Sequence, residues 1–201
     1  MKLSIAVTVI AIVGAWVGVT SASAAQQEEK PVPEYFTDVP NGWRFEALPF
    51  PLEFAPSLAY TGVEELMFAP GMFDPEKADF FSYAFLWVVE GSDMPDMPKL
   101  KQDIEHYYYG LQRAVYADAE GPVAVQLHLV SGDSGSAPRY KGTIDWVEPF
   151  KTKAGQRLEF DAEFWRCSTD LHWGAYFIVA PDGADASVIK SLQRLSFKRC
   201  N

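Results

Sequence analysis

The sequence is poor in the residues that most often carry chemistry. Its 201 residues include only two cysteines and three histidines. His106, His128 and His172 stand far apart and show none of the spacings, such as HxH or HExxH, that hold a metal ion. No glycine-rich cofactor loop is present either. We therefore expect no metal site and no cofactor.

Basic residues are also scarce. Lysine and arginine number 17 against 27 aspartate and glutamate residues, which gives a net charge of −10. Nucleic acids and anionic membranes are bound through concentrated basic residues, so neither is an expected partner. In contrast, 48% of the residues are hydrophobic and 14% aromatic, which is typical of an ordered globule.

The longest apolar run lies at the N-terminus. Lys2 precedes an apolar run over residues 3–19, and residues 22–24 (Ala-Ser-Ala) fit a small-x-small cleavage site. This pattern predicts a secretory signal peptide over residues 1–24, with an uncleaved anchor helix as the alternative. The run is short for a membrane span, which needs about 20 residues. We expect an exported protein, periplasmic or secreted, with no stable membrane anchor after cleavage.

The rest of the chain divides into a polar, proline-bearing stretch and a single domain. We predict that residues 25–41 form a flexible lead-in, because they have little apolar surface that could pack against the domain. Residues 42–201 have a length that suits one domain. The number of cysteines is even, with Cys167 and Cys200, and export would bring them into an oxidising compartment. We therefore predict a disulfide between them, with a reactive thiol as the alternative. The chain-entropy model gives such a bond about 3–4 kcal/mol of stabilisation.

Periodicity predicts the fold class. Two-residue alternation marks about seven strands, and residues 99–118 carry apolar positions at helical spacing. A stretch at 80–90 is apolar on both faces, which predicts a central strand covered on both sides. The order βββ-α-ββββ-α indicates an α+β domain. Its single, mainly antiparallel β-sheet would pack against a principal helix (about 99–118) and a short C-terminal helix (about 184–195).

The clearest element is a hairpin over residues 156–181. Leu158, Phe160, Ala162 and Phe164 alternate with three acids, and Trp173, Ala175, Phe177 and Val179 continue the apolar set. Pairing Arg166 with Leu171 would put Phe164 opposite Trp173 and Phe160 opposite Phe177, so that large residues face large ones. The acids would then lie together on the other face.

This acidic stripe is the main candidate site. Carboxylates two residues apart on a strand are about 6–7 Å apart, a separation that suits acid/base pairs or a shared cation. The proposed register adds aromatic and histidine neighbours. The candidate ligand site therefore comprises Glu159, Asp161, Glu163, Trp165, His172 and Tyr176. The alternative is a solvated outer face without function.

Two other stretches are weaker candidates. Gly132-Asp133-Ser134-Gly135 resembles the nucleophile segment of trypsin-like serine proteases, but the flanking residues depart from that pattern and no histidine has the required context. A flexible turn explains the same residues. The proline-rich apolar stretch 48–60 would offer a partner-docking patch if it were left uncovered.

No nucleophile motif, metal spacing or cofactor loop assigns a reaction, and no catalytic residue is predicted. We therefore expect an exported, non-catalytic domain that binds a small ligand or an envelope protein. The alternative is a secreted hydrolase that uses Glu159, Asp161, Glu163 and His172.

We expect export to remove residues 1–24, because the small-x-small site directly follows the apolar run. Mass spectrometry of the exported protein should find Ala25 as its first residue. Ala22→Arg should leave the precursor uncut, whereas Glu29→Arg, beyond the site, should not. An exported protein that keeps Met1 would indicate the anchor helix instead.

Overall fold

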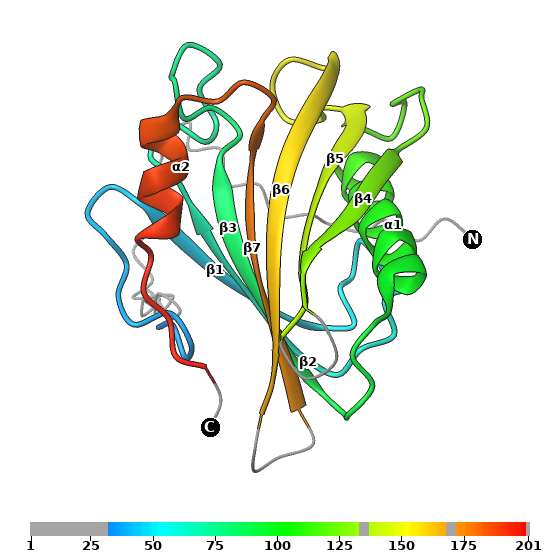
Figure 1. Ribbon diagram of the computed structural model, residues 1–201. Helices are drawn as coiled ribbons and strands as arrows, with labels where there is room; N and C mark the ends of the chain where they lie inside the picture. Colours follow the sequence, from blue (N-terminus) through cyan, green and yellow to red (C-terminus); the bar gives the residue numbers. More distant parts are fainter. Residues whose placement is uncertain (1–31, 133–136, 168–171, 200–201) are drawn as a thin grey trace, which may run out of the picture. The chain divides into compact units, whose positions relative to one another are not determined.

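In the computed structural model, the described residues (32–132, 137–167 and 172–199) form one seven-stranded antiparallel sheet with a helix on each face (Figure 1). The sheet order is β1-β2-β3-β7-β6-β5-β4. This confirms the predicted α+β fold with a principal helix and a short C-terminal helix. The elements are β1 (Arg44–Phe50), β2 (Gly62–Phe68), β3 (Tyr83–Glu90), α1 (Met97–Val115), β4 (Ala124–Ser131), β5 (Arg139–Val147), β6 (Gly155–Arg166), β7 (His172–Pro181) and α2 (Ala186–Gln193).

Helix α1 begins where its capping residues place it. The Asp96 side chain accepts a hydrogen bond from the Lys99 backbone N–H at 2.9 Å, which satisfies one of the free donors of the first turn. Gly110 lies where the chain over residues 54–55 crosses the helix, and a Cβ there would be 2.0 Å from the Phe54 carbonyl oxygen. The glycine is therefore needed for this close approach. No helix among the described residues is long and apolar enough to cross a membrane.

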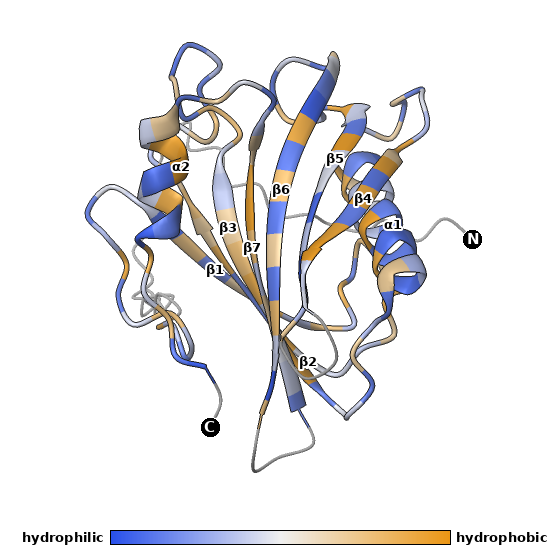
Figure 2. Ribbon diagram, in the orientation of Figure 1, coloured by the Kyte–Doolittle hydropathy of each residue, from blue (hydrophilic) through white to orange (hydrophobic). Residues whose placement is uncertain are grey.

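The sheet has a hydrophobic cluster on each face. On the α1 side, Tyr107 and Tyr108 pack against residues such as Phe85 and Phe177. On the α2 side, Leu192 packs with Leu86 and other buried side chains. Strand β3 contributes alternate residues to both clusters, as its two apolar faces predicted. Figure 2 shows the different pattern of β6, in which hydrophilic and hydrophobic residues alternate.

The predicted β6–β7 register is wrong by two residues, although the predicted faces are right. Arg166 pairs with Trp173, so Phe164 faces Ala175 and Phe177 faces Ala162. Large residues thus face small ones, and the aromatic rings interlock diagonally: Phe164 stacks on Trp173 with centroids 5.9 Å apart. Phe177 also stacks on Phe85 of β3 at 4.3 Å, a contact that the hairpin alone does not reveal.

Local backbone chemistry explains where strands β3 and β1 begin or end. Strand β3 begins at Tyr83 and not at Phe80, because Phe81 has a φ of 51°, in the left-handed region. Strand β1 continues through Pro49, which an edge strand tolerates. The stretch over residues 48–60 is not an open apolar patch, since Leu52 and Leu58 are buried in the core.

Part of the predicted lead-in is fixed to the sheet. The buried Glu65 carboxylate accepts hydrogen bonds from the backbone N–H groups of Glu34, Tyr35 and Phe36 at 2.6–3.1 Å. Phe36 also forms a β-bridge with Phe197. These bonds hold the start of the described chain beside its C-terminal end. Residues 1–24, the predicted signal peptide, lie outside the described residues.

A second carboxyl, that of Glu64, is fully buried on the α1 side of β2. Its Oε1 accepts a hydrogen bond from Trp87 Nε1 at 2.9 Å. Burial raises the pKa of Glu64 to about 8, because hydrogen bonding to Trp87 and Tyr107 favours the ionised form too little to offset the lost hydration. Glu64 is therefore protonated over much of the neutral range.

This raised pKa makes stability depend on pH. The native carboxyl holds its proton between about pH 4.5 and pH 8, where the unfolded one has lost it. The free energy of unfolding should therefore fall as pH rises through this window, by up to about 1.4 kcal/mol per pH unit. Glu64→Gln should remove this dependence while keeping an acceptor for Trp87. Urea denaturation at several pH values tests this, with the exposed Glu76→Gln as control. An unchanged pH slope in Glu64→Gln would contradict it.

Candidate functional site

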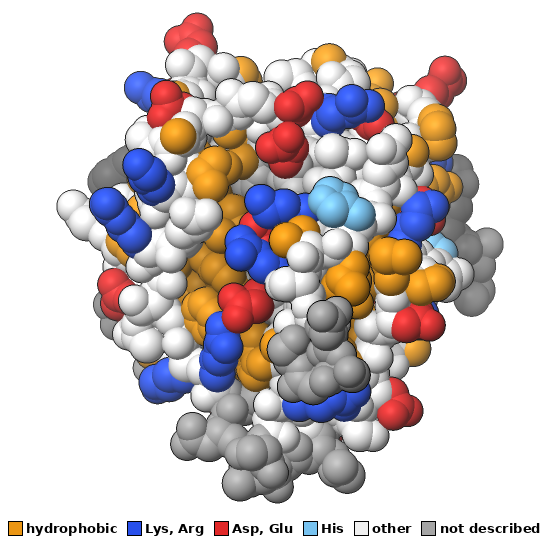
Figure 3. Space-filling view, in the orientation of Figure 1, with side chains coloured by type: hydrophobic (Ala, Val, Ile, Leu, Met, Phe, Trp, Pro, Cys, Tyr) orange, Lys and Arg blue, Asp and Glu red, His pale blue; other side chains and the backbone are white. Residues whose placement is uncertain are grey.

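The candidate site lies on the face of the sheet opposite α1. Helix α2 covers only part of this face. Its N-cap is Asp185, whose side chain accepts a hydrogen bond from the Ser187 N–H at 2.7 Å. The helix packs on β7 through buried Val188 and Leu192. The Tyr176 hydroxyl donates to the Leu192 carbonyl oxygen at 2.7 Å and fixes the helix to the sheet. Strands β4, β5 and β6 are left open beside the helix (Figures 1 and 3).

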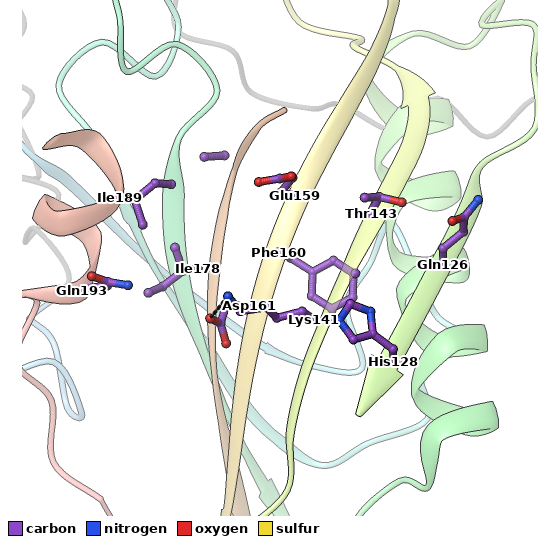
Figure 4. A pocket seen from close by; sticks show the side chains of 12 residues that line it. Gln126, His128, Lys141, Thr143, Glu159, Phe160, Asp161, Ile178, Ile189 and Gln193 are labelled. Carbon is purple, nitrogen blue, oxygen red and sulfur yellow. Dashed lines mark ion pairs between the residues drawn. The ribbon is translucent and has the colours of Figure 1, made fainter. Parts of the chain in front are cut away.

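A groove of about 380 Å³ runs between α2 and the open strands. Two rows of directly paired residues cross it. One row is Gln126–Thr143–Glu159–Ala180, and the other is His128–Lys141–Asp161–Ile178. Ile189 and Gln193 line it from α2 (Figure 4). Each row draws one residue from each of four strands, so the sheet pairing itself fixes the order of the lining side chains.

The groove has an apolar side and a polar side. Ile178 and Ala180 of β7 and Ile189 of α2 supply apolar lining, and Ile178 lies beside Ile189 in Figure 4. Figure 3 shows hydrophobic surface between the helix and the charged central strands. The lining residues of β4, β5 and β6 are mainly polar or charged. A molecule in this groove would therefore meet hydrocarbon on one flank and hydrogen-bonding groups on the other.

One acid of the groove is already neutralised. Arg139 binds Asp161 through two hydrogen bonds, from Nε at 2.7 Å and from the terminal nitrogen at 2.5 Å. This paired geometry is the strongest that a carboxylate and a guanidinium form, and it raises the pKa of Arg139. Lys141 Nζ lies 3.7 Å from the same carboxylate, beyond hydrogen-bond distance.

Other polar side chains of the groove have no partner in the part of the chain that the structure describes. Among the described residues, Glu159, Thr143, Gln126, His128 and Gln193 make no side-chain hydrogen bond, and Glu159 and His128 form no ion pair. Their donors and acceptors are available to water or to a ligand. Glu159 is thus the one carboxylate of the predicted stripe without a cationic partner in the described chain.

The structure does not assemble the predicted ligand site as a unit. Glu159 and Asp161 line the groove, but Glu163 is bound by Arg199. Trp165 and Tyr176 are only 5% and 7% exposed, and both pack against Phe197. Because of the shifted register, Tyr176 pairs with Glu163 and not with Asp161, and Trp165 pairs with Gly174.

His172 lies far from the acids of the groove. It pairs with Glu90, whereas the partner of Glu163 is Tyr176, four residues further along β7. At roughly 3.3 Å per residue, this separates His172 from Glu163 by about 13 Å, and Glu159 is farther still. The carboxylate–histidine cluster of the hydrolase alternative is therefore not formed. No group of three metal-ligating residues occurs in the described part of the chain.

Several groove residues were not predicted. The sequence patterns did not predict the contributions of Lys141, Thr143 and α2. The two-residue alternation over residues 123–130 and 140–147 is a signal from which the groove residues of β4 and β5 could have been found. The helix contribution could not be found, since it depends on where α2 docks. The Gly132–Gly135 motif falls mostly on residues 133–136, outside the described residues.

Comparison of the chain with protein-family models, with curated proteins and with solved structures gives no match. No relative therefore suggests an activity or a ligand. Function must be argued from the chemistry and geometry of the groove itself, because a fold class alone does not specify a function.

The C-terminal segment bears on the predicted disulfide. The Arg199 guanidinium lies 5.3 Å from the centre of the Trp165 ring, and Cys167 follows β6 two residues after Trp165. Cys200 itself lies outside the described residues, so the disulfide stays a prediction.

We expect the unreduced, unfolded protein to resist alkylation at both cysteines, as measured by intact mass. Reduction should lower the free energy of unfolding by about 3–4 kcal/mol. The double variant Cys167→Ala/Cys200→Ala should unfold like the reduced wild type and be insensitive to reductant. Alkylation of two thiols without reduction would contradict the prediction.

Proposed function

We propose that this protein is an exported, non-catalytic domain that binds a small amphipathic molecule in the groove between α2 and the open strands. One observation carries the proposal. Unpartnered polar side chains, with Glu159 at their centre, face the same groove as the apolar Ile178 and Ile189. A ligand with a polar head and a hydrocarbon part would satisfy both sides at once.

The dimensions of the groove suit a small molecule. About 380 Å³ lies in the lower part of the range of roughly 300–1,000 Å³ that is typical of small-molecule sites. Its walls are strands held by paired backbones and a helix fixed through Tyr176. Such walls need little rearrangement, which lowers the entropic cost of binding.

Binding fits the geometry better than catalysis does. A nucleophile and its base must lie within hydrogen-bond reach, yet Thr143, His128 and Glu159 make no side-chain hydrogen bond to one another. His172, the histidine of the hydrolase alternative, lies at a distant pairing position. The groove therefore supplies recognition groups without an activated nucleophile.

A small ligand is also favoured over an envelope protein as the partner. The predicted docking stretch 48–60 buries Leu52 and Leu58 in the core, so it offers no continuous apolar patch. Export is part of the proposal and is supported by the signal-peptide pattern of residues 1–24. The ligand would then be met in the periplasm or outside the cell.

Filling the groove should abolish binding. Thr143→Trp places a large ring between the two flanks, whereas Thr61→Trp makes the same change at an exposed position outside the groove. Thermal-shift and calorimetric measurements with octanoate, hexylamine and leucine should show at least one binder for the wild type and for Thr61→Trp. Thr143→Trp should lose that binding without losing its fold.

Two results would contradict the proposal. If none of the three probes bound to the wild type, the groove would not be a site for small amphipathic molecules. If Thr143→Trp bound a probe as tightly as Thr61→Trp does, the binding site would lie elsewhere on the protein.

A further inference from the structure

We infer that the ligand of the groove is a zwitterion with adjacent charges, namely an α-amino acid with an aliphatic side chain. This inference rests on the proposed function, and it goes further by assigning a role to each charge in the groove. The inference depends on four charged side chains, which occupy three cross-strand pairing positions of β5 and β6: Arg139, Lys141, Glu159 and Asp161.

First, the charges of the groove favour a ligand that carries both signs. Arg139 and Asp161 neutralise each other in the paired geometry described above. One cation and one anion remain, Lys141 and Glu159. A ligand with a single charge would pair with one of them and leave the other to water. A ligand that carries both charges would pair with both.

The second step is the state of Lys141. Its only ionic neighbour among the described residues is Asp161, at 3.7 Å, and each oxygen of that carboxylate already accepts a hydrogen bond from Arg139. The Lys141 side chain is 52% exposed. Its ammonium group therefore has donors free for a ligand carboxylate. His128, the cross-strand partner of Lys141 on β4, lines the same part of the groove.

The third step is the spacing of the two free charges. Lys141 pairs with Asp161, and Glu159 lies two residues before Asp161 on β6. Lys141 and Glu159 are thus diagonal neighbours on adjacent strands, with Cβ atoms about 7–8 Å apart. An α-amino acid carries its ammonium and carboxylate groups on one carbon. With one hydrogen bond of about 2.8 Å at each end, it spans such a gap between two flexible side chains.

The fourth step is the apolar flank. Ile178 and Ala180 lie one row apart along β7, at the ends of the rows that contain Lys141 and Glu159. Ile189 of α2 lies beside Ile178 on the same side of the groove (Figure 4). The α-carbon of a ligand held by the two charges would direct its side chain toward these residues. They offer hydrocarbon, so the side chain that fits is aliphatic.

Ligands that lack one feature at a time test the inference. Calorimetry should show that leucine binds at least about tenfold more tightly than N-acetyl-leucine, leucinamide or glycine. These three lack the ammonium charge, the carboxylate and the aliphatic side chain, respectively. A tenfold change is the least expected when one charged hydrogen bond, or a buried aliphatic side chain, is lost.

Matched variants then locate each charge. Glu159→Gln should weaken leucine binding about tenfold and leave N-acetyl-leucine unaffected, because that ligand makes no use of the carboxylate. Lys141→Met should weaken leucine binding likewise and leave leucinamide unaffected. Glu163→Gln, on the same face of β6, and the exposed Lys151→Met serve as controls that should bind leucine like the wild type.

The outcomes separate the inference from the proposed function. If octanoate or hexylamine binds in a manner that Thr143→Trp abolishes, and leucine does not bind more tightly, the groove function stands and the zwitterion inference is wrong. It is also wrong if Glu159→Gln weakens N-acetyl-leucine as much as leucine. If no probe binds to the wild type, both fail.

Discussion

The close packing of Trp165 on Gly174 is the constraint on which the arrangement of the site depends. The two residues face each other across β6 and β7, and a Cβ at position 174 would lie 2.3 Å from the indole ring. The indole therefore requires glycine as its partner, and this selects one register. That register places Asp161 beside Ile178 and Glu159 beside Ala180. A shift of two residues would leave every side chain on the same face of the sheet, but it would line the groove with different cross-strand neighbours.

The groove exists because the two helices cover unequal parts of the sheet. Helix α1 has 19 residues and packs against a cluster that reaches across the whole sheet, from β1 at one edge to β4 at the other. Helix α2 has eight residues and packs over β7 and the strands next to it in the middle of the sheet. Strands β3 and β7, apolar on both faces, need cover on both sides. Strands β4 to β6 need it on one side only, so their other face can carry polar side chains and form the floor of a cleft.

The sequence predicted the elements, the faces and the acidic stripe, because these depend on local periodicity. It did not predict the β6–β7 register, since a two-residue period is unchanged by a two-residue shift. Matching large residues with large ones misled here: Phe164 stacks diagonally on Trp173, and Phe177 pairs with Phe85 of a strand outside the hairpin. For the site, Glu159 and Asp161 were correctly placed on an outer face. The side of the groove formed by Ile189 depends on tertiary docking, which no local pattern encodes.

The three acids of the stripe show how one pattern acquires three different roles. Glu163 is closed off by Arg199 of the C-terminal segment, and Asp161 by Arg139 of the neighbouring strand. Among the described residues, only Glu159 of the three has no cationic partner, and it pairs with Ala180 near the C-terminal end of β7. Equal spacing along a strand therefore does not give equal chemistry, because cross-strand and C-terminal partners decide which charge a ligand can reach. The selectivity of the groove would follow from those partners more than from the stripe itself.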